Sequence, residues 1–127
     1  MPKRKHLLIV EDDELVQSLL AAYMQNEGFK VSLATTGKEM LACIDSEAID
    51  LVLLDLGLPD ETGMEILQKL KSEKALQQMK VVVFSGSKST KNMSKAKELG
   101  AEWYFVKPDN PSDLRYIAQE LVAISTR

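Results

Sequence analysis

Short continuous apolar runs alternate along the chain with segments in which apolar residues recur every three or four positions. The runs are typical of strands buried on both faces, and the recurrent spacing is typical of amphipathic helices. The pattern predicts strands at about residues 6–10, 31–33, 51–54, 81–84 and 103–106. It predicts a helix after each strand, over about residues 15–24, 37–46, 60–73, 91–99 and 114–121. Gly28 is expected to end the first helix, Thr62 to cap the third, and Asn110 or Ser112 to cap the last.

Because a helix separates each strand from the next, the connections are crossovers, which make a parallel sheet with helices on both faces. The chain has 127 residues and no repeat, low-complexity tract or linker. We therefore expect a single α/β domain over residues 1–127, with a folded core at about residues 6–124. The expected architecture is a three-layer α/β/α sandwich of (βα)5 type. In such sheets ligands bind beyond the carboxyl ends of the strands.

Composition limits the classes of partner. The net charge of −3 argues against a general affinity for nucleic acid or anionic membranes. The first residues, Met-Pro-Lys-Arg-Lys-His, are basic, but no signal-peptide core or membrane-length apolar stretch follows, which predicts a cytoplasmic domain. Cys43 is the sole cysteine, so no internal disulfide can form. It is expected to be a small core residue.

Polar residues that carry chemistry follow four of the predicted strands. They are Glu11, Asp12 and Asp13 after the first strand, Asp55 at the end of the third, Ser85 after the fourth and Lys107 after the fifth. Because parallel strands end at one edge of the sheet, these groups are expected to converge there. Crowded carboxylates repel one another unless a cation neutralises them, and oxygen ligands without histidine or cysteine favour Mg²⁺ or Mn²⁺. The sequence therefore predicts a divalent metal site around Asp55.

Each of these residues also has a simpler role open to it. Asp12 or Asp13 would equally cap the first helix, which is a frequent task for aspartate, and of the two Asp13 is the expected cap. Ser85 would equally satisfy a loop amide, and Lys107 would equally serve as a surface lysine before a turn proline. Glu11 alone would be a solvated acid. His6 is expected to be a plain residue at a strand edge, with no nucleophile beside it.

Four stretches of the sequence resemble the receiver domain of two-component response regulators. They are LLIVEDD, LVLLDLGLPDETG, VVVFSGS and AKELGAEWYFVKP, which occur in this order across nearly the whole chain. The resemblance implies a doubly wound, flavodoxin-like fold with strand order 2-1-3-4-5. It also implies a signalling domain and not an enzyme proper. Such a domain accepts a phosphoryl group from a sensor histidine kinase or a histidine phosphotransfer protein.

The resemblance assigns roles at the acidic edge of the sheet. Asp55 is the implied phosphoacceptor. Glu11 and Asp12 are the implied acidic pair, which holds Mg²⁺ (or Mn²⁺) together with Asp55, and Asp12 is the more direct ligand. Gly57 would offer its backbone carbonyl to the metal, a task that needs no particular side chain. No other cofactor is implied.

The same resemblance makes Ser85 the hydroxyl that binds the phosphoryl group. It makes Lys107 the lysine that pairs with acceptor and phosphoryl oxygens, with a cis bond between Lys107 and Pro108. Tyr104 matches the aromatic switch position. When Ser85 moves toward the phosphoryl group, Tyr104 is expected to turn inward, and the surface of the fourth helix, fifth strand and fifth helix changes.

That surface is where an output domain or a downstream protein is expected to bind. Trp103 lies beside Tyr104 and is expected to be exposed there. A phosphorylation-dependent homodimer is compatible with the resemblance, although Glu102-Trp103 stands where regulators with winged-helix output commonly carry paired acids. Direct binding of nucleic acid or membrane by this domain is not expected.

Three other functions compete with this interpretation. A haloacid-dehalogenase-type phosphatase also uses an aspartate at a strand end with Mg²⁺, but it needs a second aspartate two residues on, where this chain has Gly57. A flavodoxin-like FMN carrier needs a phosphate-binding loop after the first strand, where residues 11–13 are acidic and would repel phosphate. The third is a receiver-like interaction module that is not phosphorylated. The complete set of acids, hydroxyl and lysine argues against it.

Overall fold

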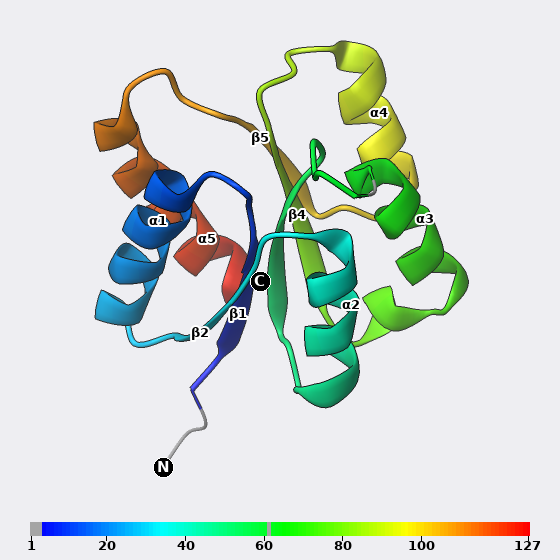
Figure 1. The fold of residues 1–127 in the computed structure, drawn as a ribbon, viewed down its shortest axis with the longest axis horizontal. Coiled ribbons are helices and arrows are strands. Elements are labelled where there is room, and N and C mark those ends of the chain that lie inside the picture. Colours follow the sequence, from blue (N-terminus) through cyan, green and yellow to red (C-terminus); the bar gives the residue numbers. More distant parts are fainter. Residues whose placement is uncertain (1–3, 61) are drawn as a thin grey trace.

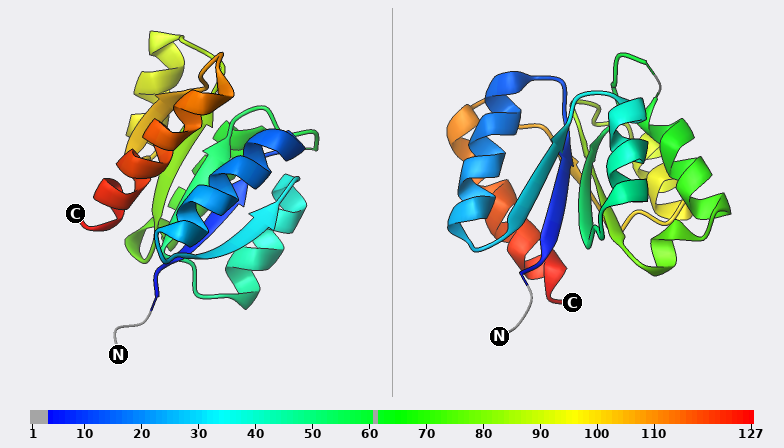
Figure 2. Two further views of the ribbon diagram at one scale, coloured as in Figure 1. Left: turned by 90° about the vertical axis from the view of Figure 1, so that its left-hand side faces the viewer. Right: turned by 60° about the horizontal axis from the view of Figure 1, so that its bottom comes forward.

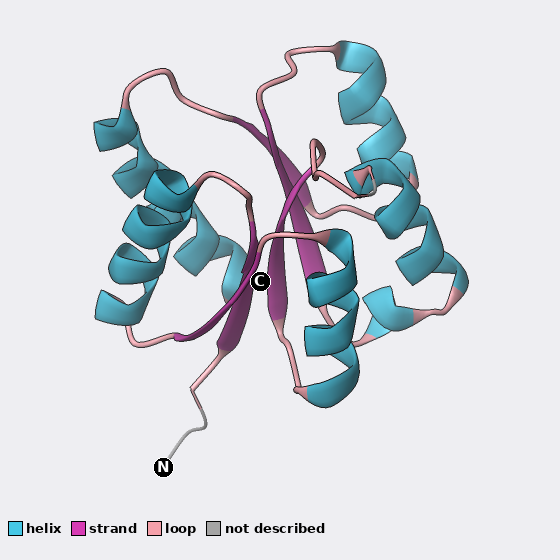
Figure 3. Ribbon diagram, in the orientation of Figure 1, coloured by secondary structure: helices cyan, strands magenta, loops and turns pink. Residues whose placement is uncertain are grey.

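The sheet is built from short strands that all run in the same direction. The computed structural model describes residues 4–60 and 62–127. The strands are β1 (His6–Val10), β2 (Lys30–Ala34), β3 (Leu51–Asp55), β4 (Lys80–Ser85) and β5 (Trp103–Val106). They pair in parallel in the order β2-β1-β3-β4-β5, as expected from the resemblance. Figure 3 shows the strands side by side between helices.

Helices cover both faces of this sheet (Figure 1). They are α1 (Glu14–Asn26), α2 (Gly37–Ser46), α3 (Gly63–Ser72), α4 (Thr90–Glu98) and α5 (Leu114–Ser125). α1 and α5 pack on one face, while α2, α3 and α4 pack on the other (Figure 2). The three-layer architecture predicted from the sequence is therefore confirmed. No helix within the described ranges is long and apolar enough to span a bilayer.

β1 illustrates how the sheet divides the core. All of its residues are buried, as expected of an inner parallel strand with helices on both faces. Leu7 and Ile9 belong to the core cluster that includes α1 and α5, whereas Leu8 and Val10 belong to the cluster that includes α2, α3 and α4. This follows from the alternation of side chains along a strand. The sheet is thus held between two apolar layers, and the polar residues lie at the carboxyl ends of its strands.

Side-chain caps fix where the helices begin, and so fix the loops that carry the site. Asp13 accepts hydrogen bonds from two amides in the first turn of α1, and Thr62 caps α3; both were predicted. Gly28 follows α1 with a φ of 94°, a conformation that favours glycine. The prediction that Asn110 or Ser112 caps the last helix is wrong, because the N-cap residue of α5 is Asp113, which makes no side-chain cap bond. Asn110 instead caps a short 3₁₀ helix at Pro111–Asp113 that leads into α5. Sequence reasoning did not anticipate that turn.

The expected cis bond between Lys107 and Pro108 is wrong. The described chain, residues 4–60 and 62–127, has trans peptide bonds throughout. Trans is the lower-energy isomer of such a bond by about 0.5–1 kcal/mol. The Lys107 amide donates to the carbonyl of Ser85 at 2.7 Å, which continues the pairing of β5 with β4. Lys107 therefore reaches the site directly after β5, with a trans bond to Pro108.

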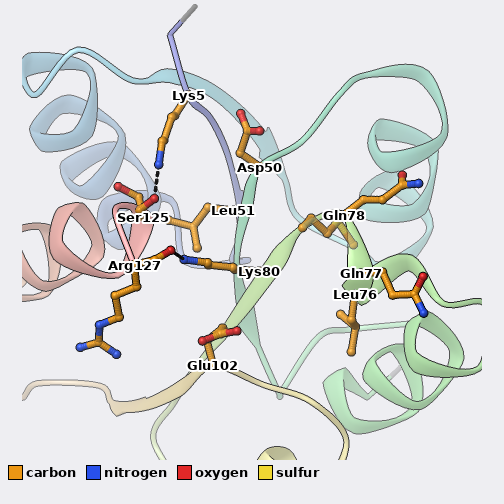
Figure 4. Close-up of a pocket in the computed structure, with 11 residues that line it drawn as sticks. Lys5, Asp50, Leu51, Leu76, Gln77, Gln78, Lys80, Glu102, Ser125 and Arg127 are labelled. Atoms are coloured by element: carbon orange, nitrogen blue, oxygen red, sulfur yellow. Dashed lines mark hydrogen bonds between the residues drawn. The ribbon is translucent and has the colours of Figure 1, made fainter.

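A hollow of about 420 Å³ lies at the edge of the sheet where the strands begin, beside the start of β4 (Figure 4). There Lys5 donates to the carbonyl of Ser125, and Lys80 donates to the carbonyls of Ile124 at 2.9 Å and Arg127 at 2.5 Å. The last carbonyls of a helix have no partner within the helix, and cations favour that end. We therefore assign these lysines to fastening the end of α5.

Candidate functional site

The predicted acidic residues meet at the carboxyl edge of the sheet. Asp55 is the last residue of β3 and is 4% exposed, while Glu11 directly follows β1 and is 1% exposed. Asp12 is exposed at the mouth of the same site. One carboxylate oxygen from each of these residues lies within 4.8 Å of the others. The convergence that the sequence predicted is thus confirmed for all three acids.

Lys107 is the cation that joins the two buried acids. Its Nζ lies 2.8 Å from Oε2 and 3.1 Å from Oε1 of Glu11. It also lies 3.1 Å from Oδ2 of Asp55. The alternative role of Lys107 as a plain surface lysine is therefore wrong, because its ammonium group points into the site. Lys107 contacts two of the three clustered carboxylates, so among the described residues the cluster remains short of positive charge.

Burial and neighbouring charges shift the pKa values of Glu11 and Lys107. Burial raises the pKa of Glu11, and the negative charge of Asp55 adds to that effect, although the hydrogen bond from Lys107 opposes it. Burial alone would lower the pKa of Lys107, but its hydrogen bond with Glu11 and the charge of Asp55 outweigh burial and raise it. Lys107 therefore stays charged near neutral pH, and the carboxylates gain from any further cation.

Glu11 brings to this cluster a buried carboxylate that depends on a shared cation. Its Oε2 is fully buried, makes no hydrogen bond among the described residues and forms an ion pair with Nζ of Lys107 at 2.8 Å. The same ammonium also serves Oε1 of Glu11 and Oδ2 of Asp55, and buried carboxylates are costly unless they are well paired. The three acids offer hard oxygen donors with no histidine or cysteine among them. The cluster therefore fits a divalent ion such as Mg²⁺ or Mn²⁺.

Asp55 is held from both sides. The amide of Gly57 donates to its Oδ1 at 3.0 Å, and Lys107 holds its Oδ2. Gly63, the first residue of α3, packs directly behind: a Cβ there would lie 2.7 Å from the backbone oxygen of Asp55 and 2.7 Å from Cα of Leu56. Only glycine lets α3 begin this close to the end of β3. The requirement for Gly63 follows from packing that sequence reasoning could not see.

Ser85 ends β4 beside this cluster and is 6% exposed. Its Oγ accepts a hydrogen bond from the amide of Ser87 at 3.1 Å, so the hydroxyl does satisfy a loop amide here. The carbonyl of Ser87 in turn accepts from the Tyr104 hydroxyl at 2.8 Å. The Oγ of Ser87 accepts from the amide of Ser89 and the side chain of Asn92. Ser87 thus lies between Ser85 and Tyr104, a link that sequence reasoning missed.

Other residues singled out from the sequence lie away from this edge. His6 is buried, and its Nε2 lies 2.7 Å from Oγ of Ser32, so the expectation that no nucleophile would lie beside it is wrong. Ser32 is a neighbour because β2 pairs with β1 in this register. Cys43 packs against the second core cluster as expected, and burial raises the pKa of its thiol.

The comparison with protein families settles what kind of domain this is. Residues 7–119 match the response regulator receiver domain. The chain belongs to the response regulator receiver family. This assignment agrees with the strand order and with the acidic cluster at the carboxyl edge of the sheet.

Curated relatives are response regulators of different lengths. The chain is 32% identical over 110 residues to the two-component response regulator ORR11 of Oryza sativa, covering 86% of this chain and 75% of that protein. It is 32% identical over 108 residues to the regulatory protein VanR of Enterococcus faecium, covering 85% of this chain. The chain spans 46% of VanR and 53% of the probable transcriptional regulator ycf29 of Pyropia yezoensis, about half of each.

Solved structures of receiver domains share the fold. A response regulator receiver domain protein (CheY-like) from Methanospirillum hungatei is 33% identical, with a TM-score of 0.81 and 98% of both chains covered. The phosphorylated cyanobacterial phytochrome response regulator RcpA is 27% identical, with a TM-score of 0.89, covering 98% of this chain and 95% of that one. Nearly the whole of this chain therefore shares its fold with these two response regulator structures.

Proposed function

We propose that this receiver domain accepts a phosphoryl group on Asp55 from a phosphohistidine of a partner protein. The observation that carries the proposal is the position of the Asp55 carboxylate, which is buried, held by Gly57 and Lys107, and surrounded by two further acids. Phosphoryl transfer spreads negative charge over the oxygens of the transferred group, so catalysis rests on positioning and on nearby positive charge. Support also comes from the relative RcpA, whose structure is of the phosphorylated protein.

The chemistry follows from the named side chains. A carboxylate oxygen of Asp55 forms a bond to phosphorus while the phosphorus–nitrogen bond of the phosphohistidine breaks. The leaving imidazole keeps the electron pair and takes up a proton from solvent. Lys107 neutralises charge on the acceptor and on the transferred group, and Ser85 donates its hydroxyl hydrogen to a phosphoryl oxygen. In its present contact the Ser85 hydroxyl accepts from the Ser87 amide, so this contact leaves the hydroxyl hydrogen available for donation.

The acidic residues are proposed to hold Mg²⁺ or Mn²⁺. Glu11, Asp12 and Asp55 would supply carboxylate oxygens, and Gly57 would supply its backbone carbonyl. When bound, the ion would neutralise charge that develops on the phosphoryl oxygens. The sharing of one ammonium, that of Lys107, by the buried carboxylates of Glu11 and Asp55 supports this assignment. So does the relative Rcp1, which is 26% identical with a TM-score of 0.85 and whose structure is of an Mn²⁺-bound form.

The output surface is proposed to lie on α4, β5 and α5. Tyr104 belongs to β5, and its hydroxyl contacts the loop that follows Ser85, so a change at the site can reach this surface. A hollow of about 310 Å³ between α4 and β5 is lined by Met93 and Trp103, among others. Trp103 is 52% exposed, as expected. An output domain or downstream protein would bind here, and a homodimer formed on phosphorylation would use the same surface.

The remaining parts of the proposal concern the protein as a whole. We assign residues 1–127 to one receiver domain in the cytoplasm. Its proposed phosphodonor is a sensor histidine kinase or a histidine phosphotransfer protein. The domain assists its own phosphorylation and dephosphorylation but turns over no separate substrate, and it binds neither nucleic acid nor membrane directly. The transcriptional roles in the names of ycf29 and of the TorCAD operon transcriptional regulatory protein TorR of Escherichia coli belong to those relatives. This chain spans 53% of ycf29 and 44% of TorR.

The decisive experiment is incubation with acetyl phosphate and Mg²⁺, followed by intact mass measurement. We expect a single phosphoryl adduct that hydroxylamine removes and that Asp55→Ala lacks. Equal labelling of Asp55→Ala would refute the proposed acceptor. A wild-type chain that takes up no phosphoryl group from either acetyl phosphate or a phosphorylated histidine phosphotransfer protein would instead be an interaction module.

A further inference from the structure

Asp60 connects two loops that are far apart in the sequence. It lies in the β3–α3 loop, five residues after Asp55, and its side chain points at the beginning of α2. Its Oδ1 accepts from the amide of Gly37 at 2.8 Å, and its Oδ2 accepts from the amide of Lys38 at 3.1 Å. Both amides belong to the first turn of a helix, where amides have no partner within the helix and negative charge is favoured. The carboxylate therefore acts as a second cap of α2, supplied from another loop.

The first turn of α2, to which Asp60 is hydrogen-bonded, is itself held in place by other contacts. Thr36 caps α2 by accepting from the amide of Glu39 at 3.0 Å. Glu39 reaches back with its Oε1 to the amide and hydroxyl of Thr35, each at 2.7 Å. Met40, in the same first turns of α2, is fully buried against the sheet. The first turn of α2 is thus a rigid point beside the β3–α3 loop (Figure 2).

The loop that Asp60 fastens also carries Gly57. The Gly57 amide binds Asp55, and a Cβ on Gly57 would lie 3.8 Å from Oδ1 of that aspartate, so this backbone runs directly past the carboxylate. At its base the loop is closed by the bridge between Gly57 and Thr62 and by the hydrogen bond from Gly63 to the carbonyl of Leu56. Asp60 holds the span between these ends.

We propose that Asp60 is a positioning residue, which uses the first turn of α2 to hold the β3–α3 loop so that the Gly57 carbonyl faces the acidic cluster. This inference rests on the proposed metal site. Groups that orient a ligand without touching the metal typically change its affinity by about 10–100-fold when they are removed. One carbonyl among several oxygen ligands is affected here, so we expect a loss of about tenfold, at the lower end of that range.

The test compares Mg²⁺ binding by calorimetry in the wild type, Asp60→Ala and Asp60→Asn. Asp45→Ala is the matched control, because Asp45 is an exposed acid on α2, the helix that Asp60 caps, and its removal changes net charge equally. We expect Asp60→Ala to weaken Mg²⁺ binding about tenfold. Asp60→Asn keeps one side-chain oxygen for the Gly37 amide and is expected to fall between the wild type and Asp60→Ala. Asp45→Ala is expected to bind as the wild type does.

A second measurement needs no metal. Amide hydrogen exchange of the peptide that contains Gly57 is expected to be faster in Asp60→Ala than in Asp45→Ala, while exchange in β1 is unchanged. Mg²⁺ binding and exchange equal to the wild type in Asp60→Ala would overturn the inference, as would equal weakening in Asp45→Ala. Failure of the wild type itself to bind Mg²⁺ would overturn the proposed metal site. The two failures are therefore distinguishable.

Discussion

The ammonium group of Lys107 lies 3.1 Å from Oδ2 of Asp55, although Asp55 ends β3 and Lys107 follows β5, two strands that are not neighbours in the sheet. β4 runs between them, and the Lys107 side chain crosses over it with its Nζ 5.4 Å from the centre of the Phe84 ring. The aromatic face and the two carboxylates together hold the cation in place. The Lys107 side chain therefore reaches from the end of β5 across β4 to the carboxylate at the end of β3.

Replacing Lys107 is expected to slow phosphorylation of Asp55 and to strengthen Mg²⁺ binding. In Lys107→Ala, phosphorylation of Asp55 by acetyl phosphate should slow strongly, because charge on the transferred group loses its fixed partner. Mg²⁺ should bind about fivefold more tightly, which corresponds to about 1 kcal/mol, because the carboxylates lose a competing cation. Intact mass time courses and calorimetry measure the two effects. Lys91→Ala, on the exposed face of α4, should change neither, and weaker Mg²⁺ binding in Lys107→Ala would contradict this account.

Gly63→Ala is expected to destabilise the domain by about 1–3 kcal/mol, since its Cβ would meet backbone atoms that cannot move independently. Gly86→Ala is the matched control, because a Cβ there has nothing within 4 Å. That change should be neutral or slightly stabilising through the unfolded chain. Urea unfolding followed by circular dichroism gives both values. Similar midpoints for the two variants would show that the contact behind Asp55 is not as tight as described.

Tyr104→Phe removes the hydroxyl that binds the Ser87 carbonyl and leaves the ring in place. The free energy of unfolding should fall by about 1 kcal/mol, the usual net value of one hydrogen bond. Tyr116→Phe removes a hydroxyl from a tyrosine that is 59% exposed and should have no measurable effect. Amide exchange in the loop at residues 86–89 should accelerate only in Tyr104→Phe. Unchanged exchange there would mean that the hydroxyl does not restrain this loop.

Mg²⁺ is expected to raise the melting temperature, because it binds the folded site and relieves repulsion among the carboxylates. At a concentration 100 times the dissociation constant, the gain should be about 2.7 kcal/mol. Asp12→Asn should lose most of this gain. Asp13→Asn makes the same change of charge at the next residue and retains a side chain that can cap α1. This variant should keep most of the stabilisation by Mg²⁺. Differential scanning calorimetry with and without EDTA tests this, and equal responses of the two variants would remove Asp12 from the metal site.

Periodicity alone was sufficient to locate the strands and helices, since each apolar run or repeat in this sequence has one plain interpretation. α2 begins and ends at the predicted residues, and β5 matches as well. The short 3₁₀ helix at Ala75–Gln77 was missed because three residues carry no periodic signal. The acids of the site were found because they directly follow strands, whose ends a parallel sheet brings together.

What the sequence could not supply were contacts made by backbone groups. Ser87 links the site to Tyr104 through its amide and carbonyl, which every residue type except proline possesses. The role of Asp60 depends on two loops that are adjacent only after folding. The isomer at Lys107–Pro108 was inferred wrongly because the local sequence does not determine it; the pairing of β5 with β4 accompanies the trans form.

The backbone character of the Ser87 link has a consequence for how such a domain can diverge. Because the contacts to Ser85 and Tyr104 use main-chain atoms, substitution at position 87 preserves the connection between them. What the side chain controls is stiffness, through the bonds of its hydroxyl to Ser89 and Asn92. A lineage could therefore retune how readily the domain responds by exchanging one small side chain, without rebuilding either the proposed phosphoacceptor or the proposed output surface.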